Sequence, residues 1–255
     1  MRPRMNENDK NPMNFRDIAV SIALLTRLPI RLHSDSFARG ARAAWAYPLA
    51  GVTVALLSAA LAWVMLLWGA GSATVALLIL AFGVVVTGAM HEDGLADCSD
   101  GFWGGWTRER RLEIMKDSQI GSYGVLALVL AMAARWWGLS LMIEARALLT
   151  LIAIAALSRG AMVVVMAALP HARSNGLSHA QGRPTALTAA MAVGIAAIVA
   201  AISCGAAAVL MLAVSALTAL GVAMIARAKI GGQTGDVLGA TQVMVEIALL
   251  LVLFG

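Results

Sequence analysis

Apolar residues run in long stretches along the chain, separated by short islands of charge. No Asp, Glu, Lys or Arg occurs between Trp45 and Met90, or between Thr185 and Ala226. About 20 residues of helix, rising 1.5 Å each, cross the roughly 30 Å hydrocarbon core of a membrane. Each of these two stretches therefore has room for two crossings. The complete pattern predicts seven membrane spans, at about 45–68, 74–90, 121–143 and 147–169, two within 185–226, and one from 237 to 254.

The composition supports this prediction. Of the 255 residues, 60% are hydrophobic and only 13% are charged, whereas a typical globular protein has about 25% charged residues. We therefore expect an all-α, polytopic helical bundle forming a single membrane domain over residues 1–255. Within it, 1–44 is an N-terminal cytoplasmic or interfacial segment and 91–118 is the main polar segment. Cys98 and Cys204 are far apart in the sequence, so we expect neither a disulfide framework nor a zinc site.

A shorter apolar run, from Ile18 to Leu25, lies between Arg16 and Arg27. It is too short to cross a bilayer, and we predict an interfacial or re-entrant helix there. The pattern leaves open whether residues 14–30 cross the membrane, which would move the extreme N-terminus to the other side.

Basic residues lie almost entirely on one side of the predicted bundle. The segments 1–44, 91–118, 170–184 and 227–236 hold 8, 4, 2 and 2 of the 19 Lys and Arg residues. Because cytoplasmic loops carry the excess of Lys and Arg, these segments are predicted to face the cytoplasm. The same rule explains the net charge of +5, and we do not expect nucleic acid as a partner.

Four acids follow the second predicted span within nine positions, directly after His91. If a helix continues there, three of them are spaced i, i+4 and i+7 and lie within about 60° of one another. Clustered carboxylates are hard oxygen ligands that suit Mg²⁺ or Mn²⁺ better than zinc. We predict a metal site at these acids, the alternative being a solvated acidic loop. The predicted ligands are Glu92, Asp93, Asp97 and Asp100.

A basic segment on the same side follows the acids. Residues 107–117 have the pattern of a short amphipathic helix with Thr107 as its N-cap. Arg110, Arg111 and Lys116 of this helix are candidates to bind a diphosphate, or alternatively anionic lipid headgroups. A carboxylate face beside a basic helix is typical of metal-assisted phosphoryl transfer.

Two further features are weaker signals. Arg159 and Glu246 lie inside predicted spans, where charge is costly unless it is paired or faces a polar interior. The two are therefore candidates to pair with each other. A glycine-rich turn at 231–236, ending in Asp236, is a candidate to bind a phosphate or a base edge.

The ordered set of motifs resembles the cobalamin synthase, or adenosylcobinamide-GDP ribazoletransferase, family. The likeness covers nearly the whole chain. It is carried by Leu25 to Pro29, Tyr47 to Gly51, His91 to Gly101, Arg110 to Ser118, Ile120 to Gly124, Ser158-Arg159 and Thr234 to Ala240. It implies a multi-pass protein of the bacterial or archaeal inner membrane, dependent on Mg²⁺, with its active site facing the cytoplasm.

The resemblance also implies a reaction. A ribose hydroxyl of α-ribazole, or of α-ribazole 5′-phosphate, would attack adenosylcobinamide-GDP and release GMP. Asp93, Asp97 and Asp100 would hold Mg²⁺ on the diphosphate, with Glu92 as an additional ligand. The sequence leaves the choice of acceptor open, and it also leaves open whether the chain forms a homo-oligomer.

The same likeness assigns roles to further residues. Arg110 and Lys116 would neutralise charge on the departing GMP, and His91 or Asp117 would act as the general base. Arg27, Asp117 and Asp236 are the remaining candidates for substrate binding.

Two other protein classes share part of this pattern. The run Asp97 to Gly101 matches the opening of the CDP-alcohol phosphotransferase motif, but Gly104-Gly105 stands where that motif has Ala-Arg. A transporter would place its key polar residues near the bilayer midplane, whereas most acids here cluster at one membrane face.

Overall fold

The computed structural model describes residues 13–255, and these residues form helices without any strand. An expectation about the extreme N-terminus lies outside this range. In chain order the elements are α1 (Arg16–Leu25), η2 (Ser34–Ala46), α2 (Tyr47–Leu67), α3 (Ser72–Thr87), α4 (Met90–Gly104), α5 (Arg108–Ile114), α6 (Ser122–Glu144), α7 (Leu148–Ala168), α8 (Leu177–Gln181), α9 (Ala186–Cys204), α10 (Ala207–Ile230) and α11 (Gly235–Phe254).

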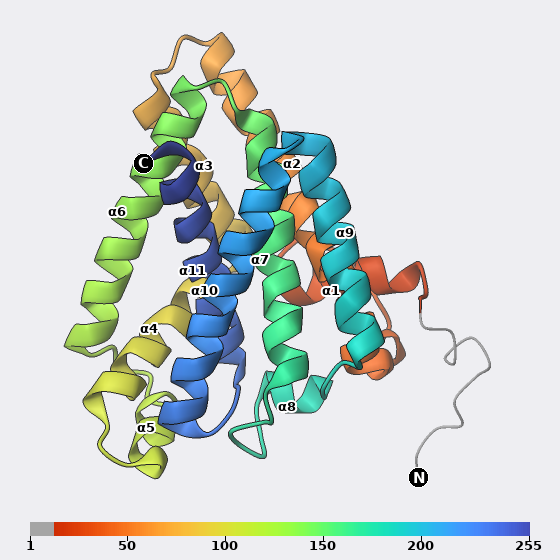
Figure 1. Ribbon diagram of the computed structural model, residues 1–255, viewed down its shortest axis with the longest axis vertical. Helices are drawn as coiled ribbons and strands as arrows, with labels where there is room; N and C mark the ends of the chain where they lie inside the picture. Colours follow the sequence, from red (N-terminus) through yellow and green to blue (C-terminus); the bar gives the residue numbers. More distant parts are fainter. Residues whose placement is uncertain (1–12) are drawn as a thin grey trace.

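Long apolar helices run side by side along the long axis of the molecule (Figure 1). By length and composition, six helical stretches among the described residues are able to cross a membrane: Ser34–Leu67, which joins η2 and α2, and α6, α7, α9, α10 and α11. A seventh crossing is reached when α3 and α4, which are bent by 86° at their junction, count as one broken span. The prediction of an all-α membrane bundle is confirmed.

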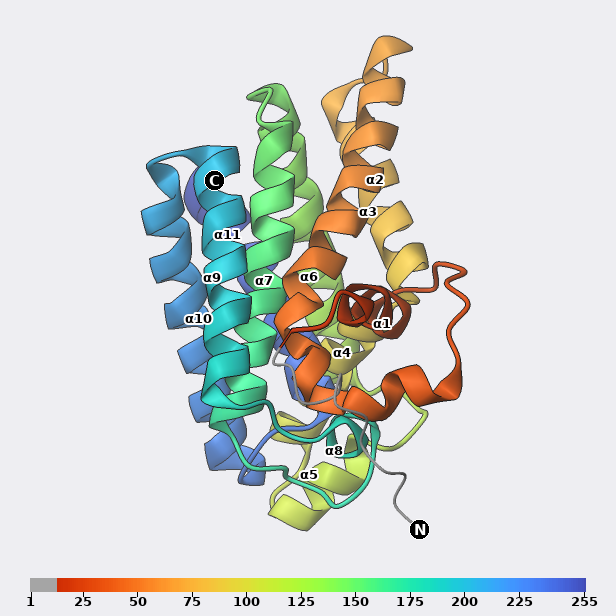
Figure 2. The same cartoon turned by 90° about the vertical axis from the view of Figure 1, so that its right-hand side faces the viewer.

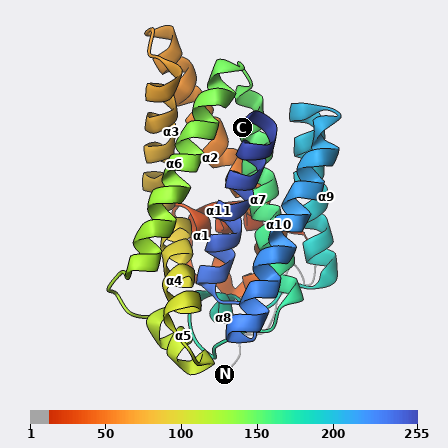
Figure 3. The same ribbon diagram turned by 60° about the vertical axis from the view of Figure 1, so that its left-hand side comes forward.

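The sharp bend between α3 and α4 is made by two successive residues in the left-handed region. Gly88 has φ of 66° and Ala89 has φ of 57°. Gly88 adopts this conformation without steric cost, whereas Ala89 is a non-glycine residue that adopts it only because the surrounding structure holds it there. The bend directs α4 away from α3, so that α4 packs between α6 and α11 (Figure 3).

The helix predicted near the N-terminus is α1, which lies across the direction of the long helices (Figure 2). Its buried Asp17 holds it in place. The Asp17 carboxylate accepts hydrogen bonds from Arg39 Nε at 2.7 Å and from Trp45 Nε1 at 2.8 Å. These bonds tie α1 to η2, and through it to the start of α2.

The backbones of α4 and α11 approach each other closely. A Cβ atom added at Gly94 would lie 2.7 Å from the carbonyl oxygen of Asp236, and one at Gly239 would lie 3.2 Å from Cα of His91. Only glycine leaves room for this approach. The packing therefore brings the acidic helix α4 against Asp236, the second residue of α11.

Candidate active site

The acidic segment is helical throughout, as the sequence analysis expected. Asp93 and Asp97 are one turn apart on α4, and Asp93 is exposed while Asp97 is half-buried. No hydrogen bond or ion pair joins either carboxylate to another side chain within residues 13–255. Asp97 interacts electrostatically with Asp236, Asp93 and Arg173. These two acids are therefore the members of the predicted set that are available to a ligand.

A cavity of about 140 Å³ lies beside Asp93 and is lined by residues of α4, α8 and α11. Helix α8 lies near the same end of the bundle as α5 (Figure 1). Leucine and methionine side chains form much of its wall. Its polar lining comes from four parts of the chain and consists of Tyr47, His91, Asp93, Arg173, Ser178, Gln181 and Asp236. Such a mixture of an apolar wall and a few convergent polar groups is typical of a small-molecule site.

Arg173 and Asp236 both line this cavity and form an ion pair with each other. Arg173 Nη2 donates to Asp236 Oδ2 at 3.1 Å, and Thr234 Oγ1 donates to the same oxygen at 3.0 Å. The Thr234 side chain also accepts from the backbone N–H of Val237 and so caps α11. Asp236, a candidate from the sequence analysis, thus lines the cavity, and so does Arg173, which the sequence analysis did not single out.

Gln233 joins the two connections that carry Arg173 and Asp236. This fully buried side chain accepts from Ser178 Oγ at 2.6 Å, and its amide nitrogen donates to Nδ1 of His171 at 2.9 Å. The backbones pair as well, because Ala172 N donates to Gln233 O and Gln233 N to Pro170 O. The glycine-rich turn at 231–236 is therefore attached to the connection between α7 and α9. Its role in binding a phosphate or a base edge stays a prediction.

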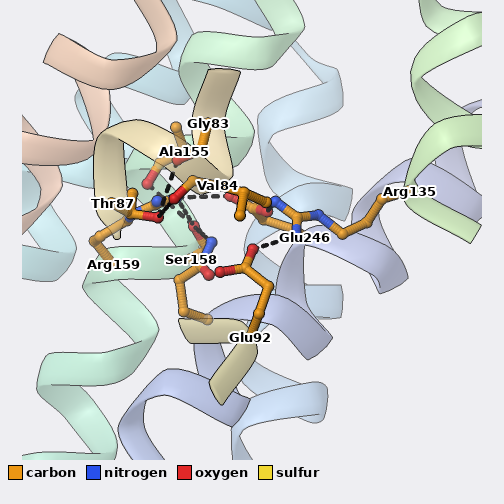
Figure 4. A network of polar contacts seen from close by, with 10 residues as sticks. Gly83, Val84, Thr87, Glu92, Arg135, Ala155, Ser158, Arg159 and Glu246 are labelled. Carbon is orange, nitrogen blue, oxygen red and sulfur yellow. Dashed lines mark hydrogen bonds and ion pairs between the residues drawn. The ribbon is translucent and has the colours of Figure 1, made fainter. Parts of the chain in front are cut away.

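Glu92 belongs to a buried network of charges and not to the cavity (Figure 4). Arg135 Nη1 lies 2.6 Å from Glu92 Oε1, and Arg135 Nη2 lies 2.9 Å from Glu246 Oε2. Arg159 Nη1 lies 2.6 Å from Glu246 Oε1. The expected pairing of Arg159 with Glu246 is present, and Arg135 extends it to Glu92. One oxygen of Glu92 stays buried without a partner.

Asp100 is also engaged by the protein. Its carboxylate accepts the backbone N–H of Gly121 at 2.7 Å and that of Gly124 at 2.8 Å. These are orphan donors at the start of α6, where a carboxylate is stabilising. Asp100 therefore shares a helix with Asp93 and Asp97 but caps the start of α6.

The basic segment forms the predicted helix, and Thr107 accepts from Arg110 N as its N-cap. Its cations do not reach the cavity. Arg110 pairs with Glu113 at 2.8 Å on an exposed face, and Arg111 donates to the carbonyl oxygens of Gly105 and Lys229. Lys116 is exposed and is not among the residues that line the cavity. The structure thus separates these cations from the free acids.

Three other predicted residues have different locations. His91 is 1% exposed and lines the cavity, with Nε2 lacking a hydrogen-bond partner. Arg27 packs against Gly88 at the bend between α3 and α4. Asp117 is exposed and accepts from Gln119 N. Of these three, His91 alone lines the cavity.

The predicted metal site depends on which of its acids are free of protein partners. Within residues 13–255, no group of three or more His, Cys, Asp and Glu side chains is placed to hold a metal ion by itself. Glu92 and Asp100 already have protein partners. Mg²⁺ usually binds one or two carboxylates and completes its octahedron with water and phosphate oxygens. Asp93 and Asp97, with Asp236 nearby, fit that requirement, and the four-acid site stays a prediction.

Fold and site together define a class: a polytopic membrane protein with a cavity at one end of its helical bundle, lined by Asp93, Asp236, Arg173 and His91 among others. Comparison with known proteins narrows this class. The chain belongs to the cobalamin-5-phosphate synthase family, whose model matches residues 17–254.

Individual relatives agree with the family. The chain is 41% identical over 249 residues to the adenosylcobinamide-GDP ribazoletransferase of Sinorhizobium medicae, covering 92% of this chain and 94% of the relative. It is 40% identical over 240 residues to the protein of the same name from Bradyrhizobium diazoefficiens, covering 92% of each. No solved structure matches the chain.

Proposed function

We propose that this chain is an adenosylcobinamide-GDP ribazoletransferase that joins adenosylcobinamide-GDP to α-ribazole or α-ribazole 5′-phosphate and releases GMP. Family membership over residues 17–254 supports the activity. The observation that carries the placement of the site is the cavity that brings Asp93, Asp236, Arg173 and His91 together. The family assignment does not support the two other classes considered from the sequence.

The transfer needs a nucleophile, a leaving group and a proton acceptor. The acceptor's ribose oxygen forms a bond to the phosphorus on the cobinamide side of the diphosphate. The bond from that phosphorus to the bridging oxygen breaks, and GMP leaves with the electron pair. His91 is the proposed proton acceptor, because its buried Nε2 has no hydrogen-bond partner among the described residues and the residue lines the cavity.

Asp93 and Asp97 are the proposed ligands of Mg²⁺, with Asp236 beside them. Bound there, Mg²⁺ would neutralise negative charge on the diphosphate and on the departing GMP. The protein's own part is to leave Asp93 and Asp97 without a side-chain partner in the described chain and to orient the substrate against α4.

The positive-inside pattern supports placing this site at the cytoplasmic face of the inner membrane. The end of the bundle that carries α5 and α8 is also the end with most of the Lys and Arg residues. Substrates made in the cytoplasm would then reach the cavity directly.

The test uses purified protein reconstituted in lipid, incubated with adenosylcobinamide-GDP, α-ribazole 5′-phosphate and Mg²⁺. We expect GMP and a complete corrinoid, and neither product after addition of a chelator. Asp93→Asn should lower kcat by about 100- to 1,000-fold. Asp35→Asn removes an exposed acid of η2 and serves as the control. Unchanged GMP release by Asp93→Asn would show that the site is placed wrongly.

A further inference from the structure

Arg173 lies in the connection between α7 and α9 and has a guanidinium group that is only partly used. One nitrogen, Nη2, donates to Asp236 at 3.1 Å. The other, Nη1, is buried and has no hydrogen-bond partner. A buried donor without an acceptor costs free energy, so this nitrogen marks a place where an additional acceptor would be stabilising.

The carboxylates around the cavity would be stabilised by a nearby cation such as Arg173. Asp93, Asp97 and Asp236 interact with one another electrostatically, and Arg173 is the cation that interacts with both Asp97 and Asp236. A substrate phosphate approaching three carboxylates would be repelled unless positive charge lies beside them. Of the cations predicted to bind a diphosphate, Arg110 is paired with Glu113 and Arg111 donates to backbone carbonyl oxygens. Lys116 is exposed and does not line the cavity.

The position of Arg173 is built by its surroundings. Next to it, Ala172 pairs through its backbone with Gln233, the buried residue that also holds Ser178 and His171. Gly176, with φ of 95°, turns the chain back beneath the guanidinium group, and a Cβ there would lie 3.3 Å from Arg173 Nε. Arg173 is thus held at the cavity by two connections that are fixed to each other.

We propose that Arg173 is a substrate-binding residue whose free Nη1 donates to a phosphate oxygen of the substrate. This inference rests on the proposed function. The phosphate has two possible sources, the diphosphate of adenosylcobinamide-GDP and the 5′-phosphate of the acceptor. An arginine side chain is able to bind either phosphate, because one guanidinium nitrogen donates to the phosphate while the other keeps its hydrogen bond to Asp236.

The kinetic test compares Arg173→Ala and Arg173→Lys with Arg183→Ala, which removes an exposed arginine from the same connection. KM is measured separately for the donor and for α-ribazole and α-ribazole 5′-phosphate. We expect Arg173→Ala to raise KM for the phosphate-bearing substrate by about 10- to 100-fold, with partial rescue by free guanidinium. Donor KM changes if the diphosphate is bound, and the preference between acceptors changes if the 5′-phosphate is bound.

A binding test separates this inference from the proposed function. Inorganic pyrophosphate with Mg²⁺ should raise the thermal unfolding midpoint of the wild-type protein and of Arg183→Ala. It should raise the midpoint of Arg173→Lys by less, and it should leave the midpoint of Arg173→Ala unchanged. Equal stabilisation of all four proteins would overturn the role of Arg173 even if the wild type is active. If pyrophosphate stabilises the wild type but not Arg173→Ala, and the wild type releases no GMP, the result would support phosphate binding by Arg173 and reject the proposed reaction. A fall in kcat alone, with every KM unchanged, would show a purely structural role.

Discussion

At the scale of single residues, the acids of α4 divide by what they contact. Asp93 and Asp97 have no hydrogen-bonded side-chain partner in the described chain, whereas Glu92 pairs with Arg135 and Asp100 caps α6. A carboxylate that already accepts two backbone N–H groups contributes to stability through those bonds. Removing such a group should therefore mainly lower the stability of the fold. Removing a carboxylate without a protein partner should mainly lower the rate of the reaction.

This difference predicts opposite effects for two neighbouring acids. Asp100→Ala should lower the free energy of unfolding by about 1–2 kcal/mol, because it leaves the first turn of α6 uncapped. Asp93→Ala should leave thermal unfolding unchanged and abolish GMP release. The checks are thermal melts in detergent and the Mg²⁺ dependence of turnover. A stable Asp100→Ala protein that needs more Mg²⁺ would restore Asp100 as a metal ligand, as the sequence indicated.

His171 predicts a pH dependence. Burial, His179 and Arg183 together lower the pKa of His171 below its ordinary value of 6.5. The neutral ring accepts from Gln233, and protonation removes that acceptor. A lowered folded pKa means that this stabilisation is complete above about pH 6.5 and is lost as pH falls through the lowered value.

The measurement is hydrogen exchange of residues 169–178 between pH 7.5 and 5.5, corrected for intrinsic exchange rates. Protection should fall at the acidic end in the wild type, and this fall should be absent in His171→Gln. His33→Gln changes an exposed histidine directly before η2 and should behave as the wild type does. Equal protection at both pH values in the wild type would contradict the assignment.

At the scale of elements, the site depends on how closely α4 and α11 approach. Gly94 and Gly239 lie where the two backbones meet. A methyl group at either position would have to displace backbone, which a packed interior resists. The spacing of these helices therefore sets the distance between the α4 acids and Asp236.

Gly94→Ala should separate the two helices and impair both stability and turnover, with a stability loss of about 1–3 kcal/mol. Gly104→Ala, on the same helix, is the matched control, because its Cβ would lie 3.7 Å from the nearest atom, Ile114 Cδ1. Thermal melts and GMP release check the pair. If both variants behave alike, the close contact is not what positions Asp236.

The sequence predicted the positions of the helices better than the contacts between side chains of different helices and connections. Long uncharged runs mark spans directly, and the i, i+4 spacing correctly placed Asp93 and Asp97 on one face. The bend at Ala89 has no such signal, since alanine rarely adopts a left-handed conformation. Arg173 was missed because its contact with Asp236 joins connections 63 positions apart, and no local pattern reports such a distance.

At the scale of the whole molecule, the two ends of the bundle differ in charge. The turns after α2, α6 and α9 contain Arg146 as their basic residue, whereas the opposite end carries the basic α5 and the connections that form the cavity. This asymmetry supports one orientation in the membrane.

Native cysteine chemistry can check that orientation. Cys204 ends α9 at the turn that should face outward, and Cys98 is buried. A membrane-impermeant maleimide should label the wild type in intact spheroplasts but not Cys204→Ser. Adding Ser118→Cys, at an exposed position between α5 and α6, to that background should restore labelling only after the membrane is opened. The reverse order of labelling would invert the topology.

The buried network of Glu92, Arg135, Arg159 and Glu246 contains two charges of each sign in one cluster. An elementary charge moved across the whole membrane field changes its energy by about 2.3 kcal/mol per 100 mV. A compact cluster whose net charge is zero interacts only weakly with that field. Turnover in proteoliposomes should therefore be the same with and without a potassium diffusion potential. A protein built in this way is able to work at one rate in an energised membrane and in a depolarised one.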